Sequence, residues 1–262
     1  MTPVQHPNWS PPNWSPKVED GARILVIGAS GGLGSAVVDM LLDHSDCIVG
    51  AHGASKPYAR HDDPRVVSLI RPFHSEADCI ATVDDFIAAA GGLDGIVLMS
   101  GRLNFQGHWK DMPEQAWQAD MTDNLGHPFF LARHAMAVMR AQGRGGRIVF
   151  NGTESALHGG STHSMPYAMA KRATECMVQG MAREGAPDGV LVNGVRLGFI
   201  KSGFHQRWSG RDEAFLDKRA ELVPLKRGGE PEEAAALIVY LLSGWGAYIT
   251  GQMLALTGGD WL

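Results

Sequence analysis

Two residues in the middle of the chain, Tyr167 and Lys171, have the types and the spacing that proton transfer requires. They stand four residues apart in a segment whose pattern predicts a helix, so they share one helix face. A lysine ammonium beside a phenol stabilises the phenolate and lowers its pKa from about 10, which makes the phenol a usable acid or base near neutral pH. A hydroxyl from Thr153 or Ser155 is suited to hold a substrate oxygen beside it. A purely structural Tyr–Lys pair is the alternative that stays open here.

A glycine-rich turn is the second candidate for chemistry. Residues 28–34 (GASGGLG) follow an apolar run at 24–27 and precede an amphipathic segment at 35–42. Glycines allow a tight strand-to-helix turn and leave the amides of the helix start open to a phosphate. The spacing, G-x-x-x-G-x-G, departs from the G-x-G-x-x-G dinucleotide fingerprint. A diphosphate cofactor is the predicted ligand, and a turn without a ligand is the alternative.

These candidate residues need a scaffold that brings distant segments together. From Arg23 onward, short β-branched runs alternate with longer amphipathic segments, which is typical of βα units and a parallel sheet. Nearly unbroken apolar strands are expected when helices cover both faces. The sequence predicts strands at 23–27, 47–51, 66–70, 95–99, 146–150, 191–195 and 252–256, and helices at 32–44, 76–90, 113–142, 165–185 and 230–242. The fold class is therefore α/β, with ligands beyond the carboxyl ends of the strands.

One domain is expected to span residues 21–262, because a chain of 262 residues with 44% hydrophobic side chains can bury a full core. Residues 1–20 contain Pro-Asn-Trp-Ser-Pro twice and cannot propagate a helix or pair as a central strand, so we expect a flexible tail. The alternative is a docking arm, in which Trp9 and Trp14 pack on the body or on a neighbouring subunit.

Composition excludes several classes of partner. The net charge of −5 comes without a basic block, which argues against nucleic acid. Cys47, Cys79 and Cys176 are widely spaced and odd in number, so we expect neither a disulfide framework nor a metal site, and a reducing cytoplasm fits. No apolar run approaches the roughly 20 residues needed to span a bilayer, so no membrane partner is expected. A cytoplasmic protein that acts on small molecules is predicted.

The end of the second predicted strand bears on the choice of nucleotide. Residues 50–53 include His52 and lie where a cofactor ribose would be reached, yet they contain no acidic residue for a 2′-hydroxyl. Lys56 and Arg60 follow and are suited to a 2′-phosphate, which favours NADP over NAD. The alternative is that both are solvated loop charges, in which case NAD stays open.

Several motifs fall in one order along the chain and together resemble the short-chain dehydrogenase/reductase family, from about Gly21 to the carboxyl end. Residues 28–34 are similar to the family's T-G-x-x-x-G-x-G, with Ile27 in place of the threonine. Tyr167-x-x-x-Lys171 is similar to its catalytic Y-x-x-x-K. The WQADMTDNL segment resembles the helix that carries an active-site asparagine, which places that role on Asn124. RGGEPEE and ITGQ, near the end, resemble its closing helix and last strand.

The resemblance implies a single Rossmann-type, doubly wound sheet and an NAD(P)-dependent oxidoreductase that moves a hydride between a nicotinamide and a carbonyl or secondary alcohol carbon. It implies that Tyr167 handles the proton, that Lys171 lowers its pKa and binds the nicotinamide ribose, and that Asn124 holds a water linking Lys171 to solvent. The cofactor-binding residues that it implies are Gly28, Ser30, Gly31, Gly32, Leu33, Gly34, His52, Ser100, Gly101, Tyr167, Lys171, Gly198, Ile200 and Ser202.

Two departures concern the loops that follow strands. The family's N-N-A-G after the fourth strand is replaced by LMSG, which ends in Ser100-Gly101, so the asparagines that brace the central strands are lost. Its P-G after the sixth strand appears as Leu197-Gly198, with Ser202 at the place of a threonine that contacts the nicotinamide amide.

A third departure concerns the catalytic hydroxyl. Thr153 takes the place of the family's serine, one residue farther from Tyr167 than is usual, and Ser155 is the fallback. Glu154, between them, receives no role. These departures motivate an alternative function, a non-catalytic nucleotide-binding sensor or scaffold. Retention of Tyr167, Lys171 and Asn124 together argues against it.

The substrate is expected to lie under residues 199–222, which place aromatic side chains among glycines and charges and predict a mobile lid with an apolar underside. A plain helical insertion with one buried face is the alternative. The candidate substrate residues are Ser155, His158, His163, Phe199, Phe204 and Trp208.

Self-association is also expected. The segment 113–142 has more apolar positions than one sheet face needs. Family members resembling this chain pair through this helix and its neighbour at 165–185, so we predict a homodimer or homotetramer.

Overall fold

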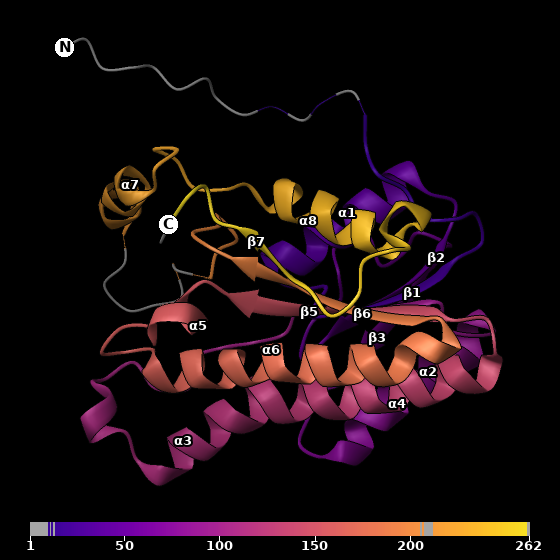
Figure 1. Ribbon diagram of the computed structural model, residues 1–262, viewed down its shortest axis with the longest axis horizontal. Helices are drawn as coiled ribbons and strands as arrows, with labels where there is room; N and C mark the ends of the chain where they lie inside the picture. Colours follow the sequence, from indigo (N-terminus) through magenta and orange to yellow (C-terminus); the bar gives the residue numbers. More distant parts are fainter. Residues whose placement is uncertain (1–9, 11, 13, 205, 207–211, 261–262) are drawn as a thin grey trace.

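The computed structural model describes residues 10, 12, 14–204, 206 and 212–260, and a sheet of seven parallel strands lies at its centre (Figure 1). The strands are β1 (Arg23–Ile27), β2 (Ile48–Gly53), β3 (Val66–Ile70), β4 (Gly95–Leu98), β5 (Gly146–Thr153), β6 (Val190–Leu197) and β7 (Met253–Leu256). Their order is β3-β2-β1-β4-β5-β6-β7. The sheet therefore winds outward in both directions from β1 and β4, and the loops after these strands meet at the switch point where ligands of such sheets bind.

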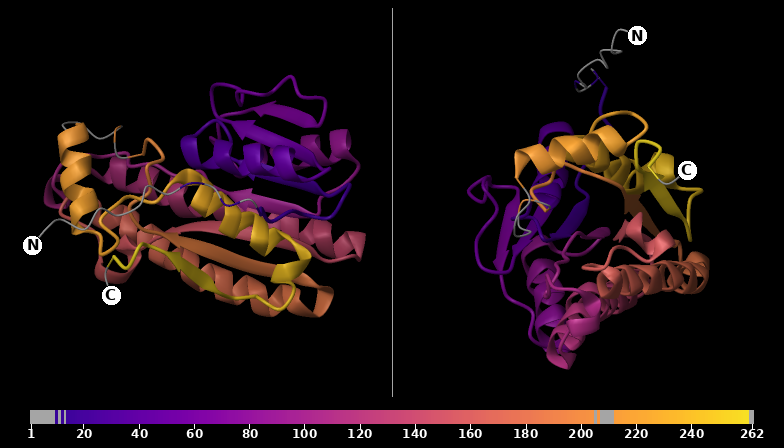
Figure 2. Two further views of the ribbon diagram at one scale, coloured as in Figure 1. Left: turned by 90° about the horizontal axis from the view of Figure 1, so that it is seen from above. Right: turned by 90° about the vertical axis from the view of Figure 1, so that its left-hand side faces the viewer.

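Helices cover both faces of the sheet, as Figures 1 and 2 show. One face carries α1 (Gly32–His44) and α8 (Pro231–Leu242), and the other carries α2 (Glu76–Ala90), α4 (His127–Gln142) and α6 (Met165–Gly185). The other helical elements given by the described residues are η1 (Trp109–Asp111), α3 (Glu114–Met121), η2 (Thr122–Gly126), α5 (Ser155–His158), η3 (Ala186–Asp188), α7 (Glu213–Leu222) and η5 (Gly244–Gly246). The predicted doubly wound α/β fold is confirmed.

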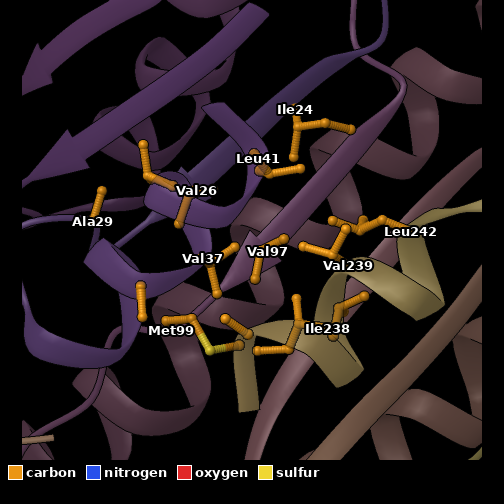
Figure 3. Close-up of a cluster of buried hydrophobic side chains, with 14 of the residues drawn as sticks. Ile24, Val26, Ala29, Val37, Leu41, Val97, Met99, Ile238, Val239 and Leu242 are labelled. Carbon is orange, nitrogen blue, oxygen red and sulfur yellow. The ribbon is translucent and has the colours of Figure 1, made fainter. Parts of the chain in front are cut away.

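The alternation of side chains along β1 explains why the sheet has a core on each face. Val26 packs into the cluster that α1 and α8 close with Leu41 and Ile238 (Figure 3). Leu25, next to it, points to the opposite face and packs with Phe86 of α2 and with residues of α4 and α6. The buried strands thus hold the turn after β1 rigidly from both sides.

The predicted boundaries hold closely for the strands, and the predicted helix at 113–142 differs in one detail. The chain is helical from Glu114 to Gln142, but η2 is a π-helical turn between α3 and α4. A π-turn inserts an extra residue into the helix and rotates the turns after it.

The amino-terminal segment joins the body earlier than Gly21. Val18 is buried in the core beside α1 and α8, and its main-chain N–H donates to Ser45 Oγ at 3.1 Å. Trp14 is 64% exposed, and Trp9 lies outside the described residues.

Candidate active site

A cavity of about 330 Å³ opens at the carboxyl ends of the central strands. It runs from the glycine turn to the ends of β5 and β6 and the start of α6. The predicted residues that line it are Gly28, Gly31, Gly32, Leu33, Gly34, Gly101, Thr153, Ser155, His158, Tyr167, Gly198, Phe199, Ile200, Ser202 and Phe204. The predicted residues outside its lining are Ser30, His52, Ser100, Asn124, His163 and Lys171, and Trp208 falls outside the described residues.

The glycine turn is closed so tightly that its glycines have no room for side chains. A Cβ on Gly34 would lie 2.2 Å from the carbonyl oxygen of Gly28, and Gly28 itself has a φ of +86°. The turn is fixed to β2 because Ala29 N–H donates to His52 O at 2.7 Å. Within the described part of the chain no side chain caps the amino end of α1, so the first amides of the helix are left for an anion at the cavity wall. These residues fit a dinucleotide diphosphate.

Tyr167 and Lys171 lie in the first turns of α6, with Tyr167 at the cavity and Lys171 behind it. Both side chains are buried. The Lys171 Nζ donates to the main-chain oxygen of Asn151 on β5 at 3.1 Å and lies 5.8 Å from the centre of the Tyr167 ring. The end of β5 therefore positions the ammonium group beside the phenol.

Burial is the main influence on the titration of this pair. Burial lowers the pKa of Lys171 to about 8, which still leaves it mostly protonated at pH 7. Burial raises the pKa of Tyr167, and the negative charge of Asp120 adds to the rise. The net pKa of Tyr167 in the protein alone is therefore raised by burial, and the expected effect of Lys171 on the phenol stays a prediction.

Asn124 lies within the π-turn and joins it to the loop after β4. Its side-chain Nδ2 donates to Asp120 O at 2.9 Å and to Arg102 O at 2.8 Å, and its Oδ1 accepts from Arg102 N–H at 3.1 Å. The side chain therefore holds the loop after β4 against the helical segment. A Cβ on Gly101 would lie 3.0 Å from Asn124 Oδ1 and 3.4 Å from Lys171 Nζ, so the amide and the ammonium both approach this glycine.

The candidate hydroxyl groups lie at the end of β5. Thr153 is the last residue of the strand and pairs with Leu197 of β6, and Ser155 begins α5. Both line the cavity, so the structure brings either hydroxyl to the space that Tyr167 faces. Of the two histidines expected here, His158 lines the cavity, whereas His163 is exposed and its ring lies 6.5 Å from that of His108.

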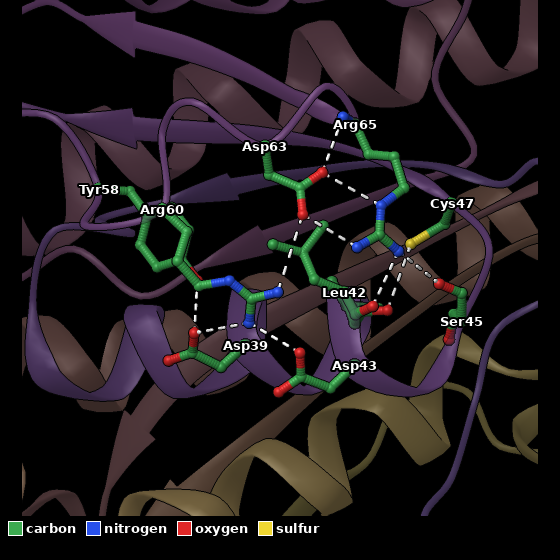
Figure 4. Close-up of polar contacts among 10 residues, drawn as sticks. Asp39, Leu42, Asp43, Ser45, Cys47, Tyr58, Arg60, Asp63 and Arg65 are labelled. Carbon is green, nitrogen blue, oxygen red and sulfur yellow. Dashed lines mark hydrogen bonds and ion pairs between the residues drawn. The ribbon is translucent and has the colours of Figure 1, made fainter.

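The nucleotide-selecting residues expected after β2 need two corrections. The His52 side chain is 3% exposed, hydrogen-bonds through Nε2 to Arg71 O at 2.8 Å and stacks on Phe73, so only its main chain touches the glycine turn. Arg60 lies against the carboxylates of α1, with Nη1 2.7 Å from Asp43 (Figure 4). The His52 ring is therefore not available to a cofactor ribose, and the Arg60 guanidinium lies in an ion pair rather than free for a 2′-phosphate.

Lys56 is the remaining candidate cation at this end. It is exposed. A Cβ added to Gly53 would lie 2.1 Å from the main-chain oxygen of Lys56 and 2.9 Å from Ser30 Oγ, so both atoms lie close to Gly53. Ser30 therefore belongs to the β2 side of the glycine turn.

Sequence reasoning missed other residues of the cavity wall. The one sign of them in the sequence is that they follow predicted strands or lie near the predicted lid. They are Met99, Asn151, Gly152, Glu154, Gly160, Ser161, Ser164, Leu197, Arg219 and Asp260. Within the described residues no group of His, Cys, Asp or Glu side chains is arranged to hold a metal ion. In the same part of the chain, no helix combines the length and apolar character of a membrane span.

Comparison with known proteins adds to this geometry. The family model described as enoyl-(acyl carrier protein) reductase matches residues 73–260. The chain belongs to the short-chain dehydrogenase/reductase family. It is 30% identical over 250 residues to the 3-oxoacyl-[acyl-carrier-protein] reductase FabG of Vibrio cholerae, covering 93% of this chain and 98% of the relative. It is 31% identical over 263 residues to an L-rhamnose 1-dehydrogenase (NAD(P)(+)) of Sphingomonas, covering 93% and 97%.

A solved structure confirms the family's fold for this oxidoreductase. The short-chain dehydrogenase/reductase from Serratia marcescens superposes with a TM-score of 0.80 at 25% identity, over 92% of this chain and 98% of that protein. Members of the short-chain dehydrogenase/reductase family use a nicotinamide cofactor, and the uncapped helix start beside the cavity fits its diphosphate.

Because the glycine turn leaves no space for a side chain, an added methyl group should lower stability there and raise it at an open glycine elsewhere. Gly34→Ala should destabilise the protein by about 1–3 kcal/mol, because its Cβ meets a main-chain oxygen. It should also weaken NADPH binding, measured by fluorescence titration. Gly180→Ala, on α6, is the control: no described atom lies within 4 Å of its added Cβ, and it should stabilise by about 0.5–1 kcal/mol. Equal unfolding free energies in urea for the two variants would contradict the constraint.

Proposed function

We propose that this oxidoreductase transfers a hydride between NAD(P) and the carbonyl or secondary alcohol carbon of a small molecule, with Tyr167 as the proton donor or acceptor. One observation carries the proposal: a single cavity joins the uncapped amino end of α1 to Thr153 and Tyr167, with Lys171 directly behind. A nucleotide at the glycine turn and a substrate oxygen at the hydroxyl groups would then share one space.

The residues of the chain divide the chemistry among them. The bound nicotinamide supplies or accepts the hydride. Thr153 Oγ1 holds the substrate oxygen by a hydrogen bond, and the Tyr167 hydroxyl gives a proton to that oxygen in reduction or takes one in oxidation. Lys171 stabilises the phenolate that forms when the proton leaves, and Asn151 O keeps its ammonium group in place. The buried walls exclude water, which strengthens these interactions.

Tyr167→Phe tests the proton-transfer role. Turnover of ketones or secondary alcohols should fall by about 10²–10⁴-fold, because the proton relay is lost, whereas the fold and the affinity for the nucleotide should be retained. Steady-state kinetics on a substrate found in a broad panel, with a nucleotide titration of the same variant, measures both. Undiminished turnover would exclude Tyr167. Nucleotide binding without turnover of the panel by the wild type would instead support the sensor or scaffold.

NADP remains our preferred nucleotide, now through Lys56 alone. NADPH should bind more tightly than NADH, and Lys56→Ala should reduce that preference by about two- to five-fold, the size expected for one exposed ion pair. Arg60→Ala is the matched control, since its guanidinium is already paired with Asp43. Fluorescence titration of both nucleotides against the three proteins gives the ratio. A larger effect of Arg60→Ala would reverse the assignment.

The segment 199–222, of which residues 205 and 207–211 lie outside the described part of the chain, is proposed as a lid over the substrate. Phe199 and Phe204 line the cavity, and α7 has no buried residue among those described. Arg219 of α7 pairs with Asp260 and lies 5.5 Å above the Phe199 ring. These contacts connect the helix to the cavity wall without packing it into a core.

We propose that the protein forms a dimer or tetramer through α4 and α6, which lie side by side (Figure 1). Phe129 of α4 and Met169 of α6 are 37% and 47% exposed, which leaves apolar surface for a partner. Light scattering at micromolar concentration should give a multiple of the monomer mass, and Met169→Asp should shift it toward the monomer. Leu222→Asp, on α7, is the control and should leave it unchanged. A monomer mass for the wild type would contradict the proposal.

A further inference from the structure

Glu154 is a buried carboxyl group at the cavity wall for which the proposed reaction has no use. It is 6% exposed, and its Oε2 has no hydrogen-bond partner among the described residues. A buried polar atom without a partner is uncommon in folded proteins and calls for an explanation such as a bound ligand.

The backbone explains how Glu154 comes to border the cavity together with its neighbours. Its main-chain N–H donates to Leu197 O at 2.9 Å, so the residue continues the pairing of β5 with β6. Its φ and ψ of −59° and −32° then turn the chain into α5. Because the extended conformation ends here, Thr153, Glu154 and Ser155 all line the same cavity.

Among the described side chains, no neighbouring cation neutralises this carboxyl group directly. Arg196, on β6, is the positive charge that acts most strongly on Glu154, but its Nε lies 3.0 Å from Glu175 Oε1 on α6. Asp260, from the carboxyl-terminal segment, and His158, on α5, also act on Glu154 electrostatically, as does Glu175. Burial raises the pKa of Glu154, Arg196 opposes the rise, and Asp260 adds to it.

The other residues of the cavity wall form the surroundings of any ligand group that binds beside Glu154. Leu197, Phe199 and Phe204 supply apolar surface. The lining also holds His158 and the pair Arg219 and Asp260. Glu154 is therefore a carboxyl group of this lining for which no ion pair is found among the described residues. A few polar groups in an apolar pocket orient a ligand.

We propose that Glu154 determines specificity by accepting a hydrogen bond from a hydroxyl or ammonium group that the substrate carries near its reacting carbon. The substrate class is thus a polyhydroxylated or amino-substituted alcohol or ketone. This inference rests on the proposed oxidoreductase reaction, in which Thr153 and Tyr167 hold the reacting oxygen. Anionic substituents at this position are disfavoured, since they would face Glu154 and Asp260 together.

Three matched probes test the proposal on the intact protein with saturating NADP⁺: cyclohexanol, trans-cyclohexane-1,2-diol and trans-2-aminocyclohexanol. Binding is measured by saturation-transfer NMR and oxidation by absorbance of the reduced nucleotide. For the wild type we expect the diol or the amino alcohol to bind about five-fold or more tightly than cyclohexanol, as one added hydrogen bond to a buried acceptor would give. Glu154→Leu should abolish that preference and leave cyclohexanol binding within about two-fold.

Glu154→Gln separates the two donor groups and preserves the side-chain volume. The glutamine oxygen still accepts from a hydroxyl, so a preference for the diol should survive, whereas a preference for the ammonium should fall by about ten-fold because the charge is lost. Glu232→Gln, an exposed position on α8, is the control and should match the wild type. Circular dichroism confirms that each variant is folded.

The outcomes distinguish this inference from the proposed function. Equal binding of the three probes to the wild type, or an unchanged preference in Glu154→Leu, overturns the role of Glu154 even if the probes are oxidised. A Glu154-dependent binding preference without oxidation of any probe supports the recognition role and counts against the proposed reaction.

Discussion

A buried ammonium group that lacks a carboxylate partner among the described residues is the constraint around which the candidate site is built. Lys171 is 1% exposed, and its Nζ donates to a main-chain oxygen, Asn151 O. A cation removed from water must be compensated by nearby dipoles or lose its proton. Burial lowers the pKa of Lys171 to about 8, so the ammonium group holds its proton less firmly than a lysine in water does.

Three separate parts of the fold meet around that charge. The end of β5 supplies the carbonyl, the helical spacing of α6 brings Tyr167 to the same face, and the π-turn carries Asn124, which lies near Gly101. The central strands that position these parts are packed from both faces, so they have little freedom to shift. In the loop after β4, where the family's asparagines are absent, the Asn124 side chain binds the main chain of Arg102.

Local patterns could predict the sheet and much of the site, because their physical causes lie within a few residues. Apolar strands, the glycine turn and the Tyr167–Lys171 spacing are of this kind. Patterns along the chain could not predict where long side chains in loops find partners. Arg60 is held by carboxylates of α1, and His52 is covered by Phe73, which follows the next strand. The side chain of Asn124 is a further case, since it binds the main chain of Arg102 in the loop after β4.

Burial acts in one direction on the titratable groups of the site. It lowers the pKa of Lys171 and raises the pKa values of Tyr167 and Glu154, so each group is moved toward its neutral form. A cavity with this property favours uncharged ground states and makes each oriented dipole count for more than it would in water. Burial also favours the protonated form of Glu154, which can donate as well as accept a hydrogen bond. In the proposed reaction, recognition of a hydroxyl group and transfer of a proton would therefore both depend on one physical feature, the burial of these side chains at the ends of β5 and β6.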